Sequence, residues 1–117
     1  MSASASSPQA AENPHYRFGQ FELRPAERRL LVGGCDAHLG SRAFDVLVTL
    51  VERRWGVVSK DELLDCVWPG LVVEEANVQV QVSALREVIG ARAVATIHRR
   101  GYRFAMVVEP GRDGVGS

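Results

Sequence analysis

The chain has 117 residues, 46% of them hydrophobic, and its 14 lysines and arginines balance its 14 acidic residues. This length supports one domain with a compact core and leaves no room for a second. The apolar runs are too short for a transmembrane helix and the N-terminus lacks the basic and hydrophobic regions of a signal peptide, so we expect a cytoplasmic chain without a membrane segment.

The first third of the chain predicts a tail and then a small antiparallel sheet. Residues 1–14 contain no aromatic or branched apolar side chain, which indicates a disordered tail before a domain spanning residues 15–109. Aromatic and apolar residues from Tyr16 to Leu23 indicate a strand that is broken or bulged near Gly19. The rest of the sheet is expected as a turn at 25–27, a strand over 29–32, a turn at Gly33 and Gly34, and a short strand over 35–39.

Two helices are expected next. Ser41 is a suitable N-cap for a helix through Arg53, whose apolar residues follow the spacing i, i+3, i+4 and i+7 from Phe44. Ser59 and Glu62 have the spacing of a capping box, which predicts a second helix from there to about Val67. Proline and glycine at 69–70 end it.

The link over residues 69–75 is longer than the turn of about 3–4 residues in a simple helix-turn-helix. It contains three consecutive apolar residues, Leu71, Val72 and Val73, which are unusual in a surface loop. We expect at least one of them to be buried in the core, and the alternative is a contact site.

A third helix is expected over residues 75–89, because Val78, Val82, Leu85 and Ile89 form one apolar stripe and Gly90 suits a helix end. Residues 78–83 alternate apolar and polar, however, which is typical of a half-buried strand. The helix is favoured because residues 85–89 continue the helical period with good helix formers.

The helical prediction leaves small apolar and amide groups on the face away from the core. Such a face can enter a DNA major groove, where amides pair with base edges and small apolar groups meet thymine methyls. The alternative is an ordinary solvated or partner-packed face. The residues on this face are Asn77, Gln79, Val80, Ser83 and Ala84.

The C-terminal part predicts a hairpin, with strands over 94–98 and 102–104 and a turn at 99–101. The second strand is expected to finish over 105–108, and residues 110–117 to form a flexible tail or the start of a linker. Arg99 and Arg100 at the tip suit the negative potential of a minor groove, although arginine-rich turns are also common on plain surfaces.

Charge is distributed unevenly along the chain, although the net formal charge is zero. Residues 86–103 contain five arginines and one glutamate, whereas residues 44–75 contain seven acidic and three basic residues. The basic segment coincides with the end of the third helix and the hairpin, which favours a nucleic-acid partner.

Catalysis and metal binding have no support in the sequence. No nucleophile with a base, carboxylate pair, metal-ligand set or phosphate-binding loop is visible, so we expect no enzyme activity, no cofactor, no metal and no small-molecule substrate. Cys35 and Cys66 are 31 positions apart and the three histidines are scattered. Reduced cysteines that pack in the interior are expected, in preference to a disulfide or a metal site.

Three segments together give a specific resemblance: FDVLVTLVERRWGVVSKDELLDCVWPG, VQVSALREVIG and TIHRRGYRF. Over nearly all of residues 16–108 the chain resembles the DNA-binding domain of OmpR/PhoB-type regulators. This resemblance implies an α+β fold, a winged helix-turn-helix with a small N-terminal antiparallel sheet, three helices and a C-terminal β-hairpin wing. Within the family the chain is most similar to domains at the N-terminus of longer regulators, of the CadC/ToxR-like and ATPase- or repeat-linked types.

The resemblance implies binding of double-stranded DNA by a bacterial transcriptional regulator, with helix 75–89 in the major groove and wing 96–104 at the minor groove. Positions that approach the major groove are Asn77, Gln79, Val80, Gln81, Ser83 and Ala84. Positions that approach phosphates are Arg42, Ser59, Lys60, Trp68, Arg86 and Thr96, and wing positions are His98, Arg99, Arg100 and Tyr102. In the family the loop after the second helix can contact RNA polymerase, here Pro69, Gly70, Leu71, Val72, Val73 and Glu74.

Two departures from the family pattern leave the target sequence open. Ala84 stands where many relatives carry a base-reading arginine, and His98 stands where many carry a wing arginine. The second hypothesis is therefore a winged-helix module that binds proteins and not DNA. If DNA is bound, tandem or homodimeric binding is expected, because one module rarely gives enough specificity.

Overall fold

The computed structural model describes residues 14–112, which divide into two compact units. The sheet unit comprises the residues up to Ala37 and those from Val107, and the helical unit comprises residues His38–Met106. None of the helices in residues 14–112 has the length and hydropathy needed to cross a membrane.

The sheet unit is one antiparallel sheet with the strand order β4-β3-β2-β1-β7. Its strands are β1 (Pro14–Phe18), β2 (Phe21–Arg24), β3 (Arg29–Val32), β4 (Cys35–Asp36) and β7 (Glu109–Arg112), and the 3-10 turn η1 (Pro25–Glu27) joins β2 to β3. Of the two alternatives predicted near Gly19, the break is confirmed and the bulge is not, since β1 ends at Phe18 and β2 begins at Phe21. Gly19, at a φ of 58°, and Gln20 form the turn of a hairpin in which Phe18 faces Phe21.

The end of the described chain also differs from the prediction. Residues 105–108 are irregular, and strand β7 begins at Glu109 and pairs with β1 from Arg17↔Glu109 to Pro14↔Arg112. A proline is tolerated in β7 because it is an edge strand. Residues 110–112, expected in a tail, therefore belong to the sheet, whereas 1–13 and 113–117 lie outside the described residues.

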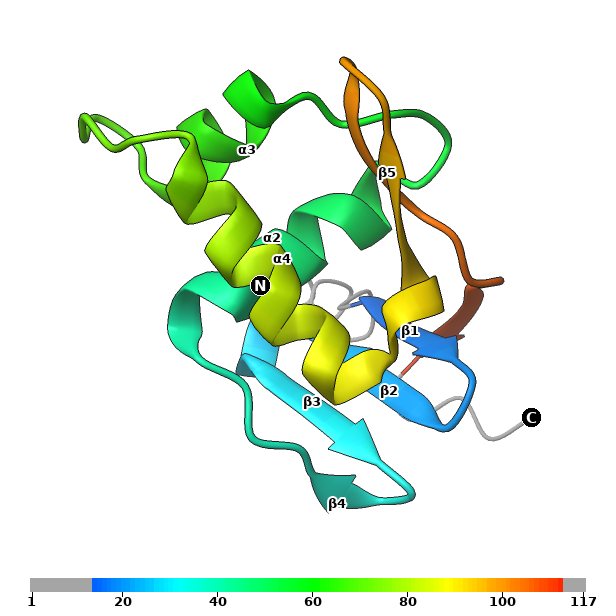
Figure 1. Ribbon diagram of the computed structural model, residues 1–117. Helices are drawn as coiled ribbons and strands as arrows, with labels where there is room; N and C mark the ends of the chain where they lie inside the picture. The colour runs from blue at the N-terminus through cyan, green and yellow to red at the C-terminus, as the bar shows by residue number, and fades with distance from the viewer. Residues whose placement is uncertain (1–13, 113–117) are drawn as a thin grey trace, which may run out of the picture. The chain divides into compact units, whose positions relative to one another are not determined.

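The helical unit contains α2 (Ser41–Glu52), α3 (Lys60–Val67) and α4 (Ala76–Ile89), followed by η2 (Ala91–Ala93) and the strands β5 (Val94–Ile97) and β6 (Gly101–Phe104) (Figure 1). Helix α2 packs against α3, α4 and β6. The core between them includes Leu47, Leu50, Leu63, Val78 and Leu85, all fully buried. Burial of each such side chain contributes about 1.5–3 kcal/mol.

Local sequence determines where α3 begins but not where α2 does. The predicted capping box is present: the Glu62 amide donates to Ser59 Oγ at 3.1 Å and the Ser59 amide donates to Glu62 Oε1 at 2.9 Å. Ser41, predicted as the N-cap of α2, is instead its first helical residue, and Gly40 in extended conformation precedes it.

Helix α4 confirms the helical prediction, and the strand alternative for residues 78–83 is wrong. Val78, Val82, Leu85 and Ile89 form the buried stripe, and Gly90 follows the helix with a φ of 106°. Burial of this stripe along the whole helix outweighs the six-residue alternation.

Cys35 and Cys66 are free thiols, as expected, but both are exposed. The prediction that they pack in the interior is wrong.

Candidate nucleic-acid interface

Hairpin β5–β6, which we call the wing, is joined to the residues between α2 and α3 by backbone pairing. The Val58 amide donates to the Tyr102 carbonyl at 2.8 Å, and the Tyr102 amide donates to the Val58 carbonyl at 2.9 Å. Val58 therefore acts as a one-residue third strand beside β6. The two consecutive β-branched residues Val57 and Val58 indicate an extended segment, but nothing in the sequence indicates its partner.

Gly101 makes this pairing sterically possible. Its φ is 141°, and a Cβ built on it would lie 2.0 Å from the Val58 carbonyl oxygen and 2.8 Å from Ser59 Cα. Both are backbone atoms that cannot rotate away. Gly101 thus holds the wing in contact with the start of α3.

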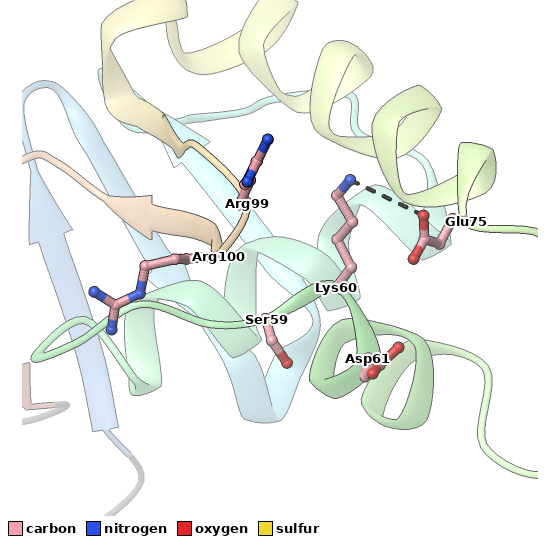
Figure 2. A pocket seen from close by; sticks show the side chains of 6 residues that line it. All are labelled: Ser59, Lys60, Asp61, Glu75, Arg99 and Arg100. Atoms are coloured by element: carbon pink, nitrogen blue, oxygen red, sulfur yellow. Dashed lines mark ion pairs between the residues drawn. The ribbon is translucent and has the colours of Figure 1, made fainter.

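The wing tip and the starts of α3 and α4 surround an open hollow of about 220 Å³ (Figure 2). It is lined by Ser59, Lys60, Asp61, Glu75, Arg99 and Arg100. Three of these side chains are cationic and two are acidic, and Lys60 Nζ lies 4.0 Å from Glu75 Oε1. The sequence predicted DNA contacts at four of these residues, but it did not predict that two carboxylates, those of Asp61 and Glu75, would line the same hollow.

The two tip arginines differ in backbone and direction. Arg99 has a φ of 63°, in the left-handed region, and Figure 2 shows its side chain and that of Arg100 pointing in different directions. Both residues and His98 are exposed. Tyr102, by contrast, is 4% exposed and its side chain is part of the core, so a structural role accounts for it without a DNA contact.

The outward face of α4 carries the predicted amide and small apolar groups. Gln79, Val80 and Ser83 are exposed, with Val80 58% exposed, and Gln81 and Ala84 are half-buried. Asn77 Nδ2 donates to the Glu74 carbonyl at 3.2 Å, so its amide is partly used in holding the first turn of the helix.

The sequence predicted that Arg86 contacts a phosphate, but its guanidinium forms hydrogen bonds within the protein. Its Nε and Nη2 donate to the Val94 carbonyl at 3.1 and 2.7 Å, and Nη2 also donates to Thr96 Oγ1 at 2.9 Å. Val94 is 1% exposed, and a buried carbonyl without a partner costs about 1–3 kcal/mol. The guanidinium therefore links α4 to β5, and it also occupies the Thr96 hydroxyl.

Arg42 and Trp68 come together at the end of α3. Arg42 Nη1 donates to the Val67 carbonyl, and its guanidinium carbon lies 5.8 Å from the centre of the Trp68 ring. Trp68 is 6% exposed, which agrees with a core position, and its indole N–H bonds to no group within residues 14–112.

The loop between α3 and α4 presents apolar side chains to solvent. Leu71 is 58% exposed and Val72 is fully exposed, while Val73 is half-buried. The expectation that at least one of them is buried in the core is wrong, because the loop leaves α3 at Trp68 and passes outside the helices. Pro69, Gly70 and Glu74 are also exposed.

Within residues 14–112, no cluster of three or more His, Cys, Asp or Glu side chains could hold a metal ion. The surface offers instead a helix whose outer face carries amide and small apolar groups, a long loop before it, and an arginine-tipped hairpin beside it. These elements define a winged helix-turn-helix.

Comparison with known proteins identifies the family. The family described as "Transcriptional regulatory protein, C terminal" matches residues 34–104, so the chain belongs to it. Over 103 residues the chain is 28% identical to the transcriptional activator CadC of Escherichia coli, covering 83% of this chain and 20% of CadC. It is 32% identical over 91 residues to the phosphate regulon regulator PhoB of Pseudomonas aeruginosa, covering 74% of this chain and 40% of PhoB. The chain thus spans between a fifth and two fifths of these relatives.

Solved structures agree with this assignment. The DNA-binding domain of E. coli CadC matches with a TM-score of 0.72 at 28% identity, covering 85% of this chain and 98% of that one. The DNA-binding domain of Klebsiella pneumoniae RstA, solved in complex with the RstA box, matches with a TM-score of 0.67 at 26% identity, covering 78% and 96%. Both domains share the fold described above.

Proposed function

We propose that this chain is the DNA-binding domain of a bacterial transcriptional regulator and binds double-stranded DNA sequence-selectively in the cytoplasm. The observation that carries the proposal is that the wing tip, the start of α3 and the start of α4 surround one cation-bearing hollow. Helix α4 would enter the major groove through Gln79, Val80, Ser83 and Ala84, and the wing would reach the minor groove. The domain has no enzymatic role in this proposal.

Phosphate contacts are proposed at the edges of this surface. Lys60 and the amides at the start of α3 would hold one phosphate, since helix N-termini favour anions. Trp68 would donate its unused indole N–H to another, with Arg42 beside it. The exposed Leu71 and Val72 are proposed to meet RNA polymerase, and two copies are proposed to bind neighbouring half-sites.

Binding to random-sequence duplex, followed by selection of the bound sequences, tests this function. We expect salt-dependent binding and enrichment of a motif, because α4 offers groups that discriminate bases. The second hypothesis, a protein-binding module, is favoured by the two carboxylates in the hollow and the exposed apolar loop. Absence of duplex binding even at low salt would favour that module and contradict our proposal.

Glu75→Gln is expected to strengthen binding to random duplex by about two- to five-fold, the range for an exposed ion pair. Glu75 holds a negative charge in the hollow and pairs with Lys60, which a phosphate would have to replace. Titration of wild-type and variant chains at several salt concentrations measures the effect.

Glu52→Gln is the matched control, because Glu52 is exposed on α2 and does not line the hollow. In a Lys60→Ala background the gain from Glu75→Gln should shrink. A gain of the same size in that background would mean that Glu75 acts by general repulsion and not through Lys60.

A further inference from the structure

The wing contacts the rest of the helical unit along both of its edges. On the β6 edge, the Tyr102 amide and carbonyl both bond to Val58. Since both groups point away from β5, the Thr96–Tyr102 pair is one of the pairs without mutual hydrogen bonds. Such pairs alternate along an antiparallel ladder, so Val94, which faces Phe104, also directs its carbonyl away from β6.

The outward carbonyl of Val94 is the group that Arg86 binds. Two guanidinium nitrogens reach it at 3.1 and 2.7 Å, and the nitrogen at 2.7 Å also reaches Thr96 Oγ1 at 2.9 Å. A two-stranded hairpin is at best marginally stable alone, so its direction depends on what holds its edges. Val58 holds one edge and Arg86 holds the other.

We propose that Arg86 is a positioning residue that fixes the wing relative to α4, so that the two elements can enter adjacent grooves together. It acts through the orientation of β5 and not through its charge at a phosphate. This inference rests on the proposed DNA binding for its consequence, but the positioning itself can be measured without DNA.

The variant Arg86→Lys distinguishes the two roles, since lysine keeps the charge but lacks the planar fork that bonds the carbonyl twice. Without DNA, we expect amide hydrogen exchange in residues 96–102 of Arg86→Lys to speed up by about ten-fold or more, while exchange in α2 is unchanged. Unchanged exchange in the wing overturns the proposal, whether or not the domain binds DNA.

With DNA, the test is whether the wing arginines still contribute. Removing the charges of Arg99 and Arg100 should weaken duplex binding strongly in the wild-type background, but by less than about three-fold in Arg86→Lys, because a displaced wing no longer reaches its groove. If Arg86→Lys only made the protein less stable, a smaller fraction of the protein would bind DNA, but removing the charges of Arg99 and Arg100 would weaken binding as strongly as in wild type. That result also overturns the proposal. So does an Arg86→Lys variant with wild-type affinity and salt dependence, which would assign Arg86 to a phosphate.

Thr96→Val removes only the third hydrogen bond and keeps the β-branched shape of the side chain. It should produce the same changes to a smaller extent, and it keeps the test available if Arg86→Lys does not fold. If no variant and no wild-type protein binds duplex, while Arg86→Lys still loosens the wing, the DNA-binding proposal fails and the positioning role stands.

Discussion

Replacing Gly101 by alanine is expected to lower the free energy of unfolding by about 2–4 kcal/mol. The new Cβ would lie 2.0 Å from the Val58 carbonyl oxygen, and the backbone would keep a φ of 141° that alanine rarely adopts. Relief of the clash requires Val58 and Tyr102 to separate, which breaks two backbone hydrogen bonds and releases the wing from α3. Denaturant unfolding measures the loss, and duplex binding should fall with it.

Two other glycines provide controls for Gly101→Ala. Gly70 has a φ of 74° with open space around it, so Gly70→Ala isolates the backbone strain at about 1–2 kcal/mol. Gly56 has open space and no positive φ, so Gly56→Ala should be close to neutral. Equal losses for Gly101→Ala and Gly70→Ala would show that the close approach to Val58 contributes nothing.

Removing the two wing arginines together, as Arg99→Gly with Arg100→Ala, is expected to weaken duplex binding by about 10- to 100-fold at low salt and to lower the salt slope by about 1–2. Arg99 and Arg100 are both exposed at the tip of the wing, where their guanidinium groups would contact a phosphate or enter a minor groove. Glycine is chosen at 99 because the φ of 63° suits it, so the folded state should not lose stability. Titrations across salt concentrations give both quantities.

Arg28→Gly is the matched control for the wing variant. Arg28 is an exposed arginine with a φ of 51°, and it lies in the sheet unit, outside the proposed interface. It should leave affinity and slope close to wild type. Wild-type affinity in the wing double variant, with an unchanged slope, would contradict the proposed interface directly.

Sequence patterns predicted the helices well where a signal is local or repeated. The capping box at Ser59 needs only two residues three positions apart, and it formed as expected. In α4 the alternating valines and glutamines favoured a strand over six residues, but Leu85 and Ile89 extended the helical stripe, and the buried stripe decided the outcome.

Strand pairing was harder to predict because it depends on partners distant in sequence. Gly19 and Gln20 do not have the usual composition of a two-residue hairpin turn, so the sequence predicted an interruption near Gly19 but not the antiparallel pairing of β1 with β2. Strand β7 has the sequence Glu-Pro-Gly-Arg, which has low strand propensity, and only its pairing with β1 makes it a strand.

The sequence predicted which segments form the candidate site, but it did not predict the roles of several side chains in it. Arg86 lies where a helix surface can face phosphate, and nothing in the sequence indicates that the Val94 carbonyl reaches it first. Which face of β6 is buried depends on the packing of β6 against α2, and Tyr102 lies on the buried face while Arg103 is exposed. The exposure of Val72 depends on the path of the loop between α3 and α4.

The two tryptophans occupy opposite environments, Trp55 at 82% exposure and Trp68 at 6%. Indole emission shifts with the polarity around the ring, so the two side chains should emit at different wavelengths and respond differently to a soluble quencher. With Trp55→Phe the chain would emit from Trp68 alone, beside Arg42 at the end of α3. The domain therefore contains an optical reporter of its own at a proposed phosphate contact, and occupancy of that contact can be followed in solution without attaching a dye.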